Sequence, residues 1–150
     1  RWLAKMELYK IPIFGRAMRK AGNISIDRYN RESAFKSLKV AANKIKNGVS
    51  VLIFPEGTRS RDGNIRPFKK GGFIMAIDSG VPIVPVVITG TRAIMPKGKF
   101  RVYPGHVSMV IHKPIGTSTY TRETKEALME SVRRVICEKF ETGKMDERAC

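Results

Sequence analysis

A chain of 150 residues and 16.9 kDa suits one domain, since a single core usually occupies about 100–200 residues. The 29 Lys and Arg against 13 Asp and Glu give a net charge of +16, and the 42% hydrophobic share excludes wholesale disorder. This charge predicts an anionic partner: nucleic acid, an anionic membrane, an acidic carrier protein or a phosphorylated small molecule. No apolar run approaches the ~18 residues that cross a bilayer. Two cysteines are too few for a disulfide framework or a zinc site.

The first half of the chain predicts strands that alternate with helices. Residues 2–5 are apolar enough for the end of a short strand. Pro12 and Gly22 bracket a short helix with one apolar and one basic side, and such a helix either packs on the core or lies on anionic lipid. Residues 23–28 alternate polar and apolar side chains, as a half-buried strand does, and residues 32–47 carry apolar side chains at helical spacing.

The middle of the chain contains two strongly apolar runs. Residues 49–54 are nearly all apolar and rich in β-branched side chains, which predicts a central strand covered on both faces. Residues 73–77 predict a buried helix that ends near Gly80. Residues 81–88 predict a strand, and its two prolines indicate an edge or a bulge because each removes a ladder donor.

The last third predicts two short strands, 101–103 and 107–111, joined around Pro104, and a final helix over residues 122–141. Strands and helices alternate through the first ninety residues. This order predicts an α/β fold: a single domain with a mostly parallel mixed sheet flanked by helices.

Charged residues follow two of the predicted strands, at the place where open α/β sheets bind ligands. The segment 55–61 follows one strand and residues 27–28 follow another. In the first segment Gly57 can expose backbone N–H groups, Thr58 offers a hydroxyl, and Arg59 offers a planar fork that suits paired phosphate oxygens. By composition alone, an ordinary solvated turn is the simpler interpretation.

The order of the residues favours a ligand site. Segment 54–60 reads FPEGTRS and resembles the acceptor-binding signature of the glycerolipid acyltransferases, the 1-acylglycerol-3-phosphate acyltransferase family. Segments 4–8 (AKMEL) and 11–15 (IPIFG) together resemble the family's lysine-bearing block. Segments 22–28 (GNISIDR) and 81–86 (VPIVPV) resemble its second and fourth blocks, in the same order. The resemblance implies a glycerol-3-phosphate-acyltransferase-like fold.

The resemblance also implies which residues bind the acceptor substrate: Lys5, Arg28, Glu56, Gly57, Thr58 and Arg59. Lys5 and Arg59 are the implied contacts of the acceptor phosphate, and the three residues before Arg59 shape a glycerol-phosphate pocket. Arg28 supports the same site, and a strand-end salt bridge with Asp27 or Glu56 is an equally good interpretation of its side chain. No metal and no organic cofactor is implied.

The family's first block, an Asn-His-x-x-x-x-Asp sequence that holds the catalytic base, does not occur in this sequence. In family order it precedes the segment 4–8, so we expect residues 1–150 to be one acyltransferase domain truncated at its N-terminus. His106 and His112 lie far downstream in the predicted hairpin region, with no aspartate five residues later, and neither is expected to act as the base. The chain alone is therefore expected to be inactive.

The implied activity moves a fatty acyl group from a thioester, acyl-CoA or acyl carrier protein, to the free hydroxyl of lysophosphatidate in phospholipid biosynthesis. The expected location is the cytoplasmic face of a membrane, on an anionic lipid surface. The alternative is a non-catalytic basic module that binds anionic membrane or nucleic acid, but one Trp and four Tyr offer little base stacking, and we expect no nucleic acid partner. Several basic residues flank the blocks and either attract lipid or carrier protein or form a solvated face: Arg66, Lys69, Lys70, Arg92, Lys97, Lys99 and Arg101.

Overall fold

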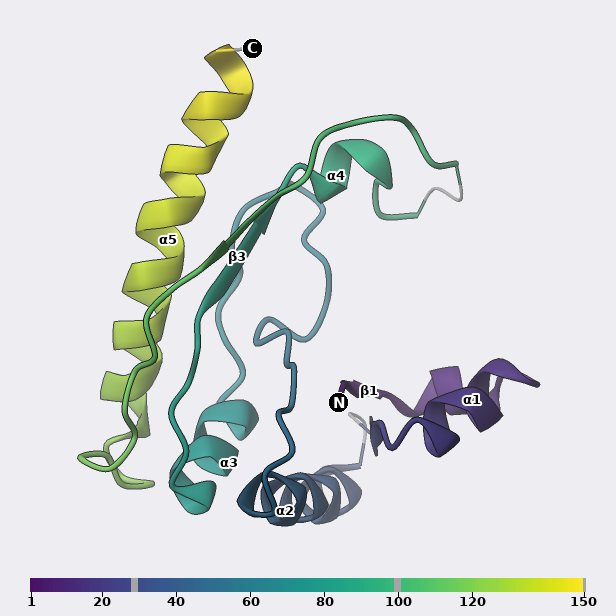
Figure 1. Cartoon of the computed structure of the whole chain (residues 1–150), viewed down its shortest axis with the longest axis vertical. Helices are drawn as coiled ribbons and strands as arrows, with labels where there is room; N and C mark the ends of the chain where they lie inside the picture. Colours follow the sequence, from purple (N-terminus) through teal and green to yellow (C-terminus); the bar gives the residue numbers. More distant parts are fainter. Residues whose placement is uncertain (28–29, 99–100, 150) are drawn as a thin grey trace.

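The computed structural model describes residues 1–27, 30–98 and 101–149 (Figure 1). The chain begins with β1 (Leu3–Lys5), the 3-10 helix η1 (Met6–Lys10), α1 (Phe14–Lys20) and β2 (Ile24–Ile26). β1 and β2 form a parallel ladder in which Leu3 lies opposite Ile24 and Lys5 lies opposite Ile26. The two helical elements between these strands form the crossover that a parallel pair requires.

The predicted central strand over residues 49–54 is reduced to one parallel bridge between Trp2 and Leu52. The Leu52 N–H donates to the Arg1 carbonyl at 2.7 Å, and the Leu3 N–H donates to the Leu52 carbonyl at 3.2 Å. Both ends of the segment are engaged elsewhere, because the Val49 N–H caps the preceding helix and the Phe54 carbonyl closes a turn. The prediction of a full strand was therefore wrong, although the segment does run parallel to β1.

Two helices pack against this parallel ladder. α2 (Arg31–Lys46) begins where the Asn30 side chain accepts a hydrogen bond from the Ser33 N–H, as N-cap residues commonly do. α3 (Gly71–Ser79) ends at Gly80. These helices and β2 share a buried apolar cluster of Ile24, Ala41, Ala42 and Met75. The predicted helices over 32–47 and 73–77 are confirmed.

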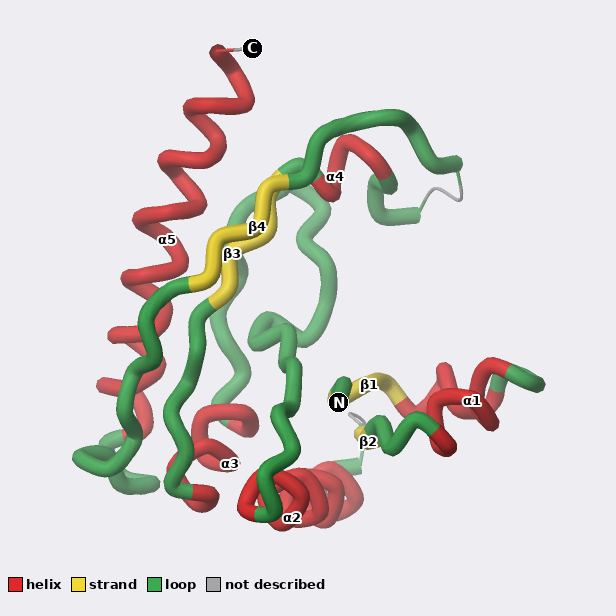
Figure 2. The backbone as a smooth tube through the Cα atoms, in the orientation of Figure 1, coloured by secondary structure: helices red, strands yellow, loops and turns green. Residues whose placement is uncertain are grey.

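The second half contains β3 (Val86–Thr89), α4 (Thr91–Ile94), β4 (Ser108–Ile111) and α5 (Lys125–Ala149). β3 and β4 lie side by side as an antiparallel ladder, and α5 runs along them (Figure 2). The strand predicted over 81–88 begins only at Val86, directly after Pro85, because the prolines lack the N–H that a ladder needs. The predicted strand over 101–103 was wrong, since the Tyr103 N–H donates to the Ile94 carbonyl at 2.9 Å instead.

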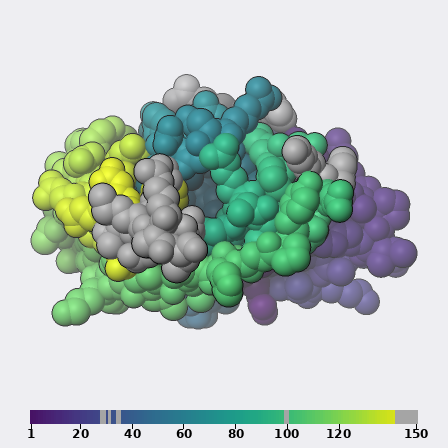
Figure 3. All heavy atoms as spheres, turned by 90° about the horizontal axis from the view of Figure 1, so that it is seen from above, coloured from purple at the N-terminus to yellow at the C-terminus, as the bar shows by residue number. Residues whose placement is uncertain are grey.

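A second apolar cluster joins α3 to α5 through Phe73, Leu128 and Val132, and the ring of Phe68 stacks on Phe73 with centroids 6.1 Å apart. The α/β fold class is confirmed. Its sheet is divided into one parallel and one antiparallel two-stranded ladder among the described residues, so the predicted single sheet was wrong in that respect. The space-filling view places the first residues and α5 at opposite ends of the molecule (Figure 3). Within the described ranges, no helix is both long enough and apolar enough to cross a membrane.

Candidate functional site

The carboxyl ends of parallel segments bring several of the predicted site residues toward one edge. Lys5 ends β1 and pairs with Ile26, the last residue of β2. The segment through Leu52 runs in the same direction, so its continuation toward Glu56 leaves the ladder at the same edge. Ligands bind at this edge in open α/β sheets, and the Lys5 side chain is exposed there. Arg28, predicted at the same edge, lies outside the described residues.

The residues that follow this segment form a closed loop, residues 55–66, which we call the signature loop. Gly57 has a φ of 74°, a left-handed conformation that glycine adopts without a steric penalty, and its N–H donates to the Phe54 carbonyl at 3.0 Å. The Glu56 carboxylate accepts a hydrogen bond from the Arg66 N–H at 2.8 Å. Glu56 thus closes the loop on itself, a structural role that its sequence position did not reveal.

Two cations from the region of α4 hold the backbone of the signature loop, and we call this pair the α4 clasp. The Arg92 guanidinium donates to the Asp62 carbonyl at 2.7 Å and to the Arg61 carbonyl at 2.9 Å. The Lys97 ammonium donates to the Arg59 carbonyl at 2.7 Å and to the Thr58 hydroxyl at 3.5 Å. Sequence reasoning grouped Arg92 and Lys97 with basic residues that attract a partner or stay solvated, so it missed their contacts with the loop.

The Arg59 side chain is exposed at the centre of this arrangement. Its Nη1 makes a long hydrogen bond of 3.5 Å to the Met95 carbonyl, on the same segment that carries Lys97. A guanidinium has five N–H donors, so this one long contact leaves it the capacity to bind an anion in a bidentate mode. The backbone of Arg59 is fixed by Lys97, whereas its charged end faces solvent.

The electrostatics around the signature loop favour an anion. The loop's two carboxylates, Glu56 and Asp62, are both hydrogen-bonded within it. Hydrogen bonds from the Asn64 N–H and the Ser60 hydroxyl hold the pKa of Asp62 below its usual value, so this carboxylate stays ionised at neutral pH. Basic side chains outnumber these two acids in the loop and its neighbourhood: Arg59, Arg61, Arg66, Lys69, Lys70, Arg92 and Lys97. Arginine side chains bind phosphate oxygens in a bidentate mode, so phosphate is one anion that such a basic surface can attract.

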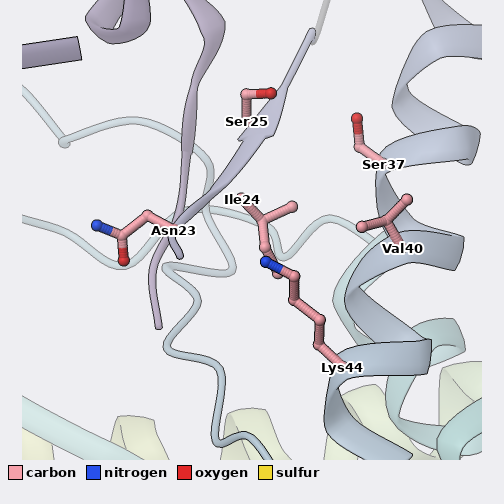
Figure 4. A pocket seen from close by; sticks show the side chains of 6 residues that line it. All are labelled: Asn23, Ile24, Ser25, Ser37, Val40 and Lys44. Atoms are coloured by element: carbon pink, nitrogen blue, oxygen red, sulfur yellow. The ribbon is translucent and has the colours of Figure 1, made fainter. Parts of the chain in front are cut away.

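Two hollows lie among the described residues, and no residue of the signature loop lines either of them. One, of about 190 Å³, lies between β2 and α2, and its lining includes Ile24, Val40 and Lys44 (Figure 4). The Lys44 ammonium donates to the Gly22 carbonyl at 3.0 Å. The other, of about 330 Å³, lies between Phe68 and the α5 side chains that include Arg133. None of the predicted acceptor-binding residues lines either hollow. Of the predicted site residues, Lys5, Thr58 and Arg59 are exposed, and Glu56 and Gly57 are half-buried.

The two histidines lie on the antiparallel side of the molecule. His106 is exposed, and the His112 N–H donates to the Pro85 carbonyl at 3.0 Å just after β4. The His112 ring is half-buried, and its Nε2 is buried with no hydrogen-bond partner among the described residues. Among those residues, no group of three His, Cys, Asp or Glu side chains is arranged to hold a metal ion.

Comparison with known proteins identifies the family. Residues 1–89 match the family model described as Acyltransferase. The chain belongs to this acyltransferase family. The matched range includes β1, β2 and the whole signature loop, and the resemblance that the sequence blocks indicated is confirmed.

Several relatives of this acyltransferase chain are 1-acyl-sn-glycerol-3-phosphate acyltransferases. The chloroplastic BAT2 enzyme of Brassica napus is 42% identical over 116 residues, which are 77% of this chain and 34% of the relative. The Haemophilus influenzae enzyme is 38% identical over 122 residues, 81% of this chain and 50% of the relative. The chain thus spans about a third to a half of the length of these curated relatives.

A solved structure supports the same fold. The crystal structure of the 1-acyl-sn-glycerophosphate (LPA) acyltransferase PlsC from Thermotoga maritima matches with a TM-score of 0.80 and 37% identity. The match covers 95% of this chain and 56% of that chain. The expectation of a glycerolipid-acyltransferase fold is therefore confirmed, while the roles of the individual site residues remain predictions.

Proposed function

We propose that this chain is the acceptor-binding part of an enzyme that transfers a fatty acyl group from a thioester to the free hydroxyl of lysophosphatidate, in phospholipid biosynthesis. The observation that carries the proposal is the exposed Arg59 guanidinium on a loop whose backbone is fixed by Lys97 and Arg92. The proposal is further supported by the relatives, which are named 1-acyl-sn-glycerol-3-phosphate acyltransferases.

In this proposal Arg59 and Lys5 bind the acceptor phosphate, and Gly57 and Thr58 form the adjoining wall for the glycerol. Arg28 supports the same phosphate. Glu56 acts through the loop, because its carboxylate already accepts the Arg66 N–H. Holding the phosphate orients the free hydroxyl toward the base, and such positioning can lower a barrier by several kcal/mol.

The catalytic base in this proposal is the histidine of the family's first block, which the present sequence does not contain. In a longer protein that block would precede the segment 4–8. The histidine takes the proton of the acceptor hydroxyl as the oxygen attacks the thioester carbonyl, and the aspartate of the block orients the imidazole. The thiol of the donor leaves, and no metal or organic cofactor takes part.

The donor in this proposal is acyl-CoA or acyl carrier protein. Both are anionic, and the net charge of +16 on this chain attracts anionic partners. The same charge favours residence at the cytoplasmic face of a membrane, on an anionic lipid surface. It also favours the second candidate function, a non-catalytic basic module that binds anionic membrane. The two differ in whether acyl transfer occurs once the missing block is supplied.

The test measures transfer of a labelled acyl group to lysophosphatidate by two purified proteins, the 150-residue chain and the same chain preceded by an Asn-His-x4-Asp block from a relative. We expect no product from the chain alone, because it lacks the base, and product from the extended protein. Transfer by the chain alone would refute the assignment of the base. A folded extended protein that is inactive with every acyl thioester favours the binding module.

A further inference from the structure

The turn between η1 and α1 exposes a small group of large apolar side chains, which we call the apolar tip: Ile11, Ile13 and Phe14. Their exposed fractions are 47%, 83% and 45%. The η1–α1 unit projects from one end of the molecule, opposite α5 (Figures 1 and 3). A single exposed apolar residue is ordinary, but a contiguous group on a projection marks an interaction surface.

The apolar tip is held in place by its backbone. The Phe14 N–H donates to the Pro12 carbonyl at 2.6 Å, and the Ala17 N–H donates to the Ile13 carbonyl at 2.9 Å. Ile13 has a φ of 63°, the left-handed region that a β-branched residue rarely adopts. The fold therefore keeps the most exposed isoleucine of the described chain in a strained conformation, where a glycine would be more stable.

The base of the apolar tip is packed closely. Gly15 is buried, and any side chain at that position would collide with the Tyr9 carbonyl. The same carbonyl accepts a hydrogen bond from Arg19 Nη1 at 3.1 Å, and Tyr9 belongs to a buried cluster with Ala4 and Met18. Packing and a hydrogen bond thus anchor the base of the tip to η1 and α1.

The side chains around the apolar tip are basic. Lys10, Arg16, Arg19 and Lys20 are all exposed, and Glu7 is the only carboxylate in residues 1–26. Apolar side chains surrounded by Lys and Arg match the interface of an anionic bilayer, where the apolar groups enter the acyl boundary and the cations meet phosphates. A protein partner that covered the same surface would need an apolar pocket surrounded by Asp and Glu side chains.

We propose that the apolar tip inserts into the interface of an anionic bilayer and that the cations around it bind the lipid phosphates. The inference rests on the proposed function in one respect: insertion of the tip would bring the candidate acceptor site to its lipid substrate. Lys5 immediately precedes η1, and a 3-10 helix of five residues is about 10 Å long, so insertion of the tip holds the candidate acceptor site close to the headgroups.

Co-sedimentation of the 150-residue chain with phosphatidylcholine vesicles, with and without phosphatidylglycerol, tests the proposal. We expect binding to the anionic vesicles that weakens with added salt. Ile13→Asp is expected to lower the partition coefficient about tenfold or more, because a charge replaces the most exposed apolar group of the tip. The matched control is Ile111→Asp on β4, where Ile111 is 63% exposed, and it is expected to bind as the parent chain does.

Ile13→Gly separates binding from folding. Glycine adopts a φ of 63° without strain, so the thermal midpoint of the Ile13→Gly variant is expected to equal or exceed that of the parent chain. The vesicle binding of this variant is expected to fall, because the exposed apolar side chain is gone. Vesicle binding that is unchanged in both Ile13 variants would overturn the proposal. So would a loss of binding in Ile111→Asp as large as that in Ile13→Asp, or equal binding of the parent chain to neutral and anionic vesicles. Vesicle binding needs no acyl transfer, so an extended protein that binds through the tip but transfers no acyl group would reject the proposed function and leave this inference standing.

Discussion

The signature loop and the core between α3 and α5 are stabilised in opposite ways. The core is apolar, and Leu128 at its centre is fully buried against Phe73 and Val132. The loop is exposed, and its conformation depends on hydrogen bonds from the Arg92 and Lys97 side chains to its carbonyl groups. Stability and acceptor binding therefore belong to different residues, and substitutions should change one without the other.

The largest effect on stability is expected in the core. Leu128→Ala removes a fully buried side chain and leaves a cavity, so the free energy of unfolding should fall by about 2–5 kcal/mol. Denaturant unfolding of the 150-residue chain measures this loss. Ile111→Ala, at a 63% exposed position, is the control and should cost well under half as much. Equal losses in the two variants would show that the buried cluster does not dominate stability.

A smaller effect, on substrate binding, is expected from the α4 clasp. Arg92→Ala removes both hydrogen bonds to the Arg61 and Asp62 carbonyls, so the loop should lose its fixed backbone while the core stays folded. In an enzyme that contains the catalytic block, we expect kcat/KM for lysophosphatidate to fall about three- to tenfold, with an unchanged thermal midpoint. Arg92→Lys should recover part of the loss.

Arg134→Ala is the control for the clasp. It removes the same charge from an exposed position of α5. If Arg134→Ala lowers kcat/KM as much as Arg92→Ala does, the effect comes from net charge and not from the hydrogen bonds to the loop.

The helices and the family could be predicted from the sequence because their signals are local. The apolar spacing within α2 acts over a few residues, and this helix was confirmed. The prolines before β3 also act locally, but the strand predicted over residues 81–88 begins only at Val86. The strand over residues 49–54 could not be assigned correctly, because its length depends on a distant partner that pairs only at Trp2. An apolar run shows that a segment is compatible with a strand but not how many of its residues pair.

The sequence predicted which residues bind the acceptor, and these roles stay predictions, but it did not predict the hydrogen bonds that hold the signature loop. The order of residues 54–60 pointed to Arg59, and that side chain is exposed on a fixed loop. The clasp joins Arg92 to carbonyls about thirty positions earlier in the chain, and no spacing rule connects a surface arginine with such a backbone group. Glu56 was predicted beside the substrate, yet it closes the loop through Arg66. Contacts with a distant backbone leave no pattern in a single sequence.

The most direct test of the proposed acceptor site is the steady-state kinetics of Arg59→Ala in an enzyme that contains the catalytic block. If the guanidinium binds the acceptor phosphate, its removal costs about 1.5–3 kcal/mol, which lowers kcat/KM for lysophosphatidate roughly ten- to hundredfold. The KM of the acyl donor should stay near that of the parent enzyme, Arg59→Lys should restore only part of the loss, and Arg61→Ala should cost little. Parent-like acceptor kinetics in Arg59→Ala, or equal losses for donor and acceptor, would contradict the account.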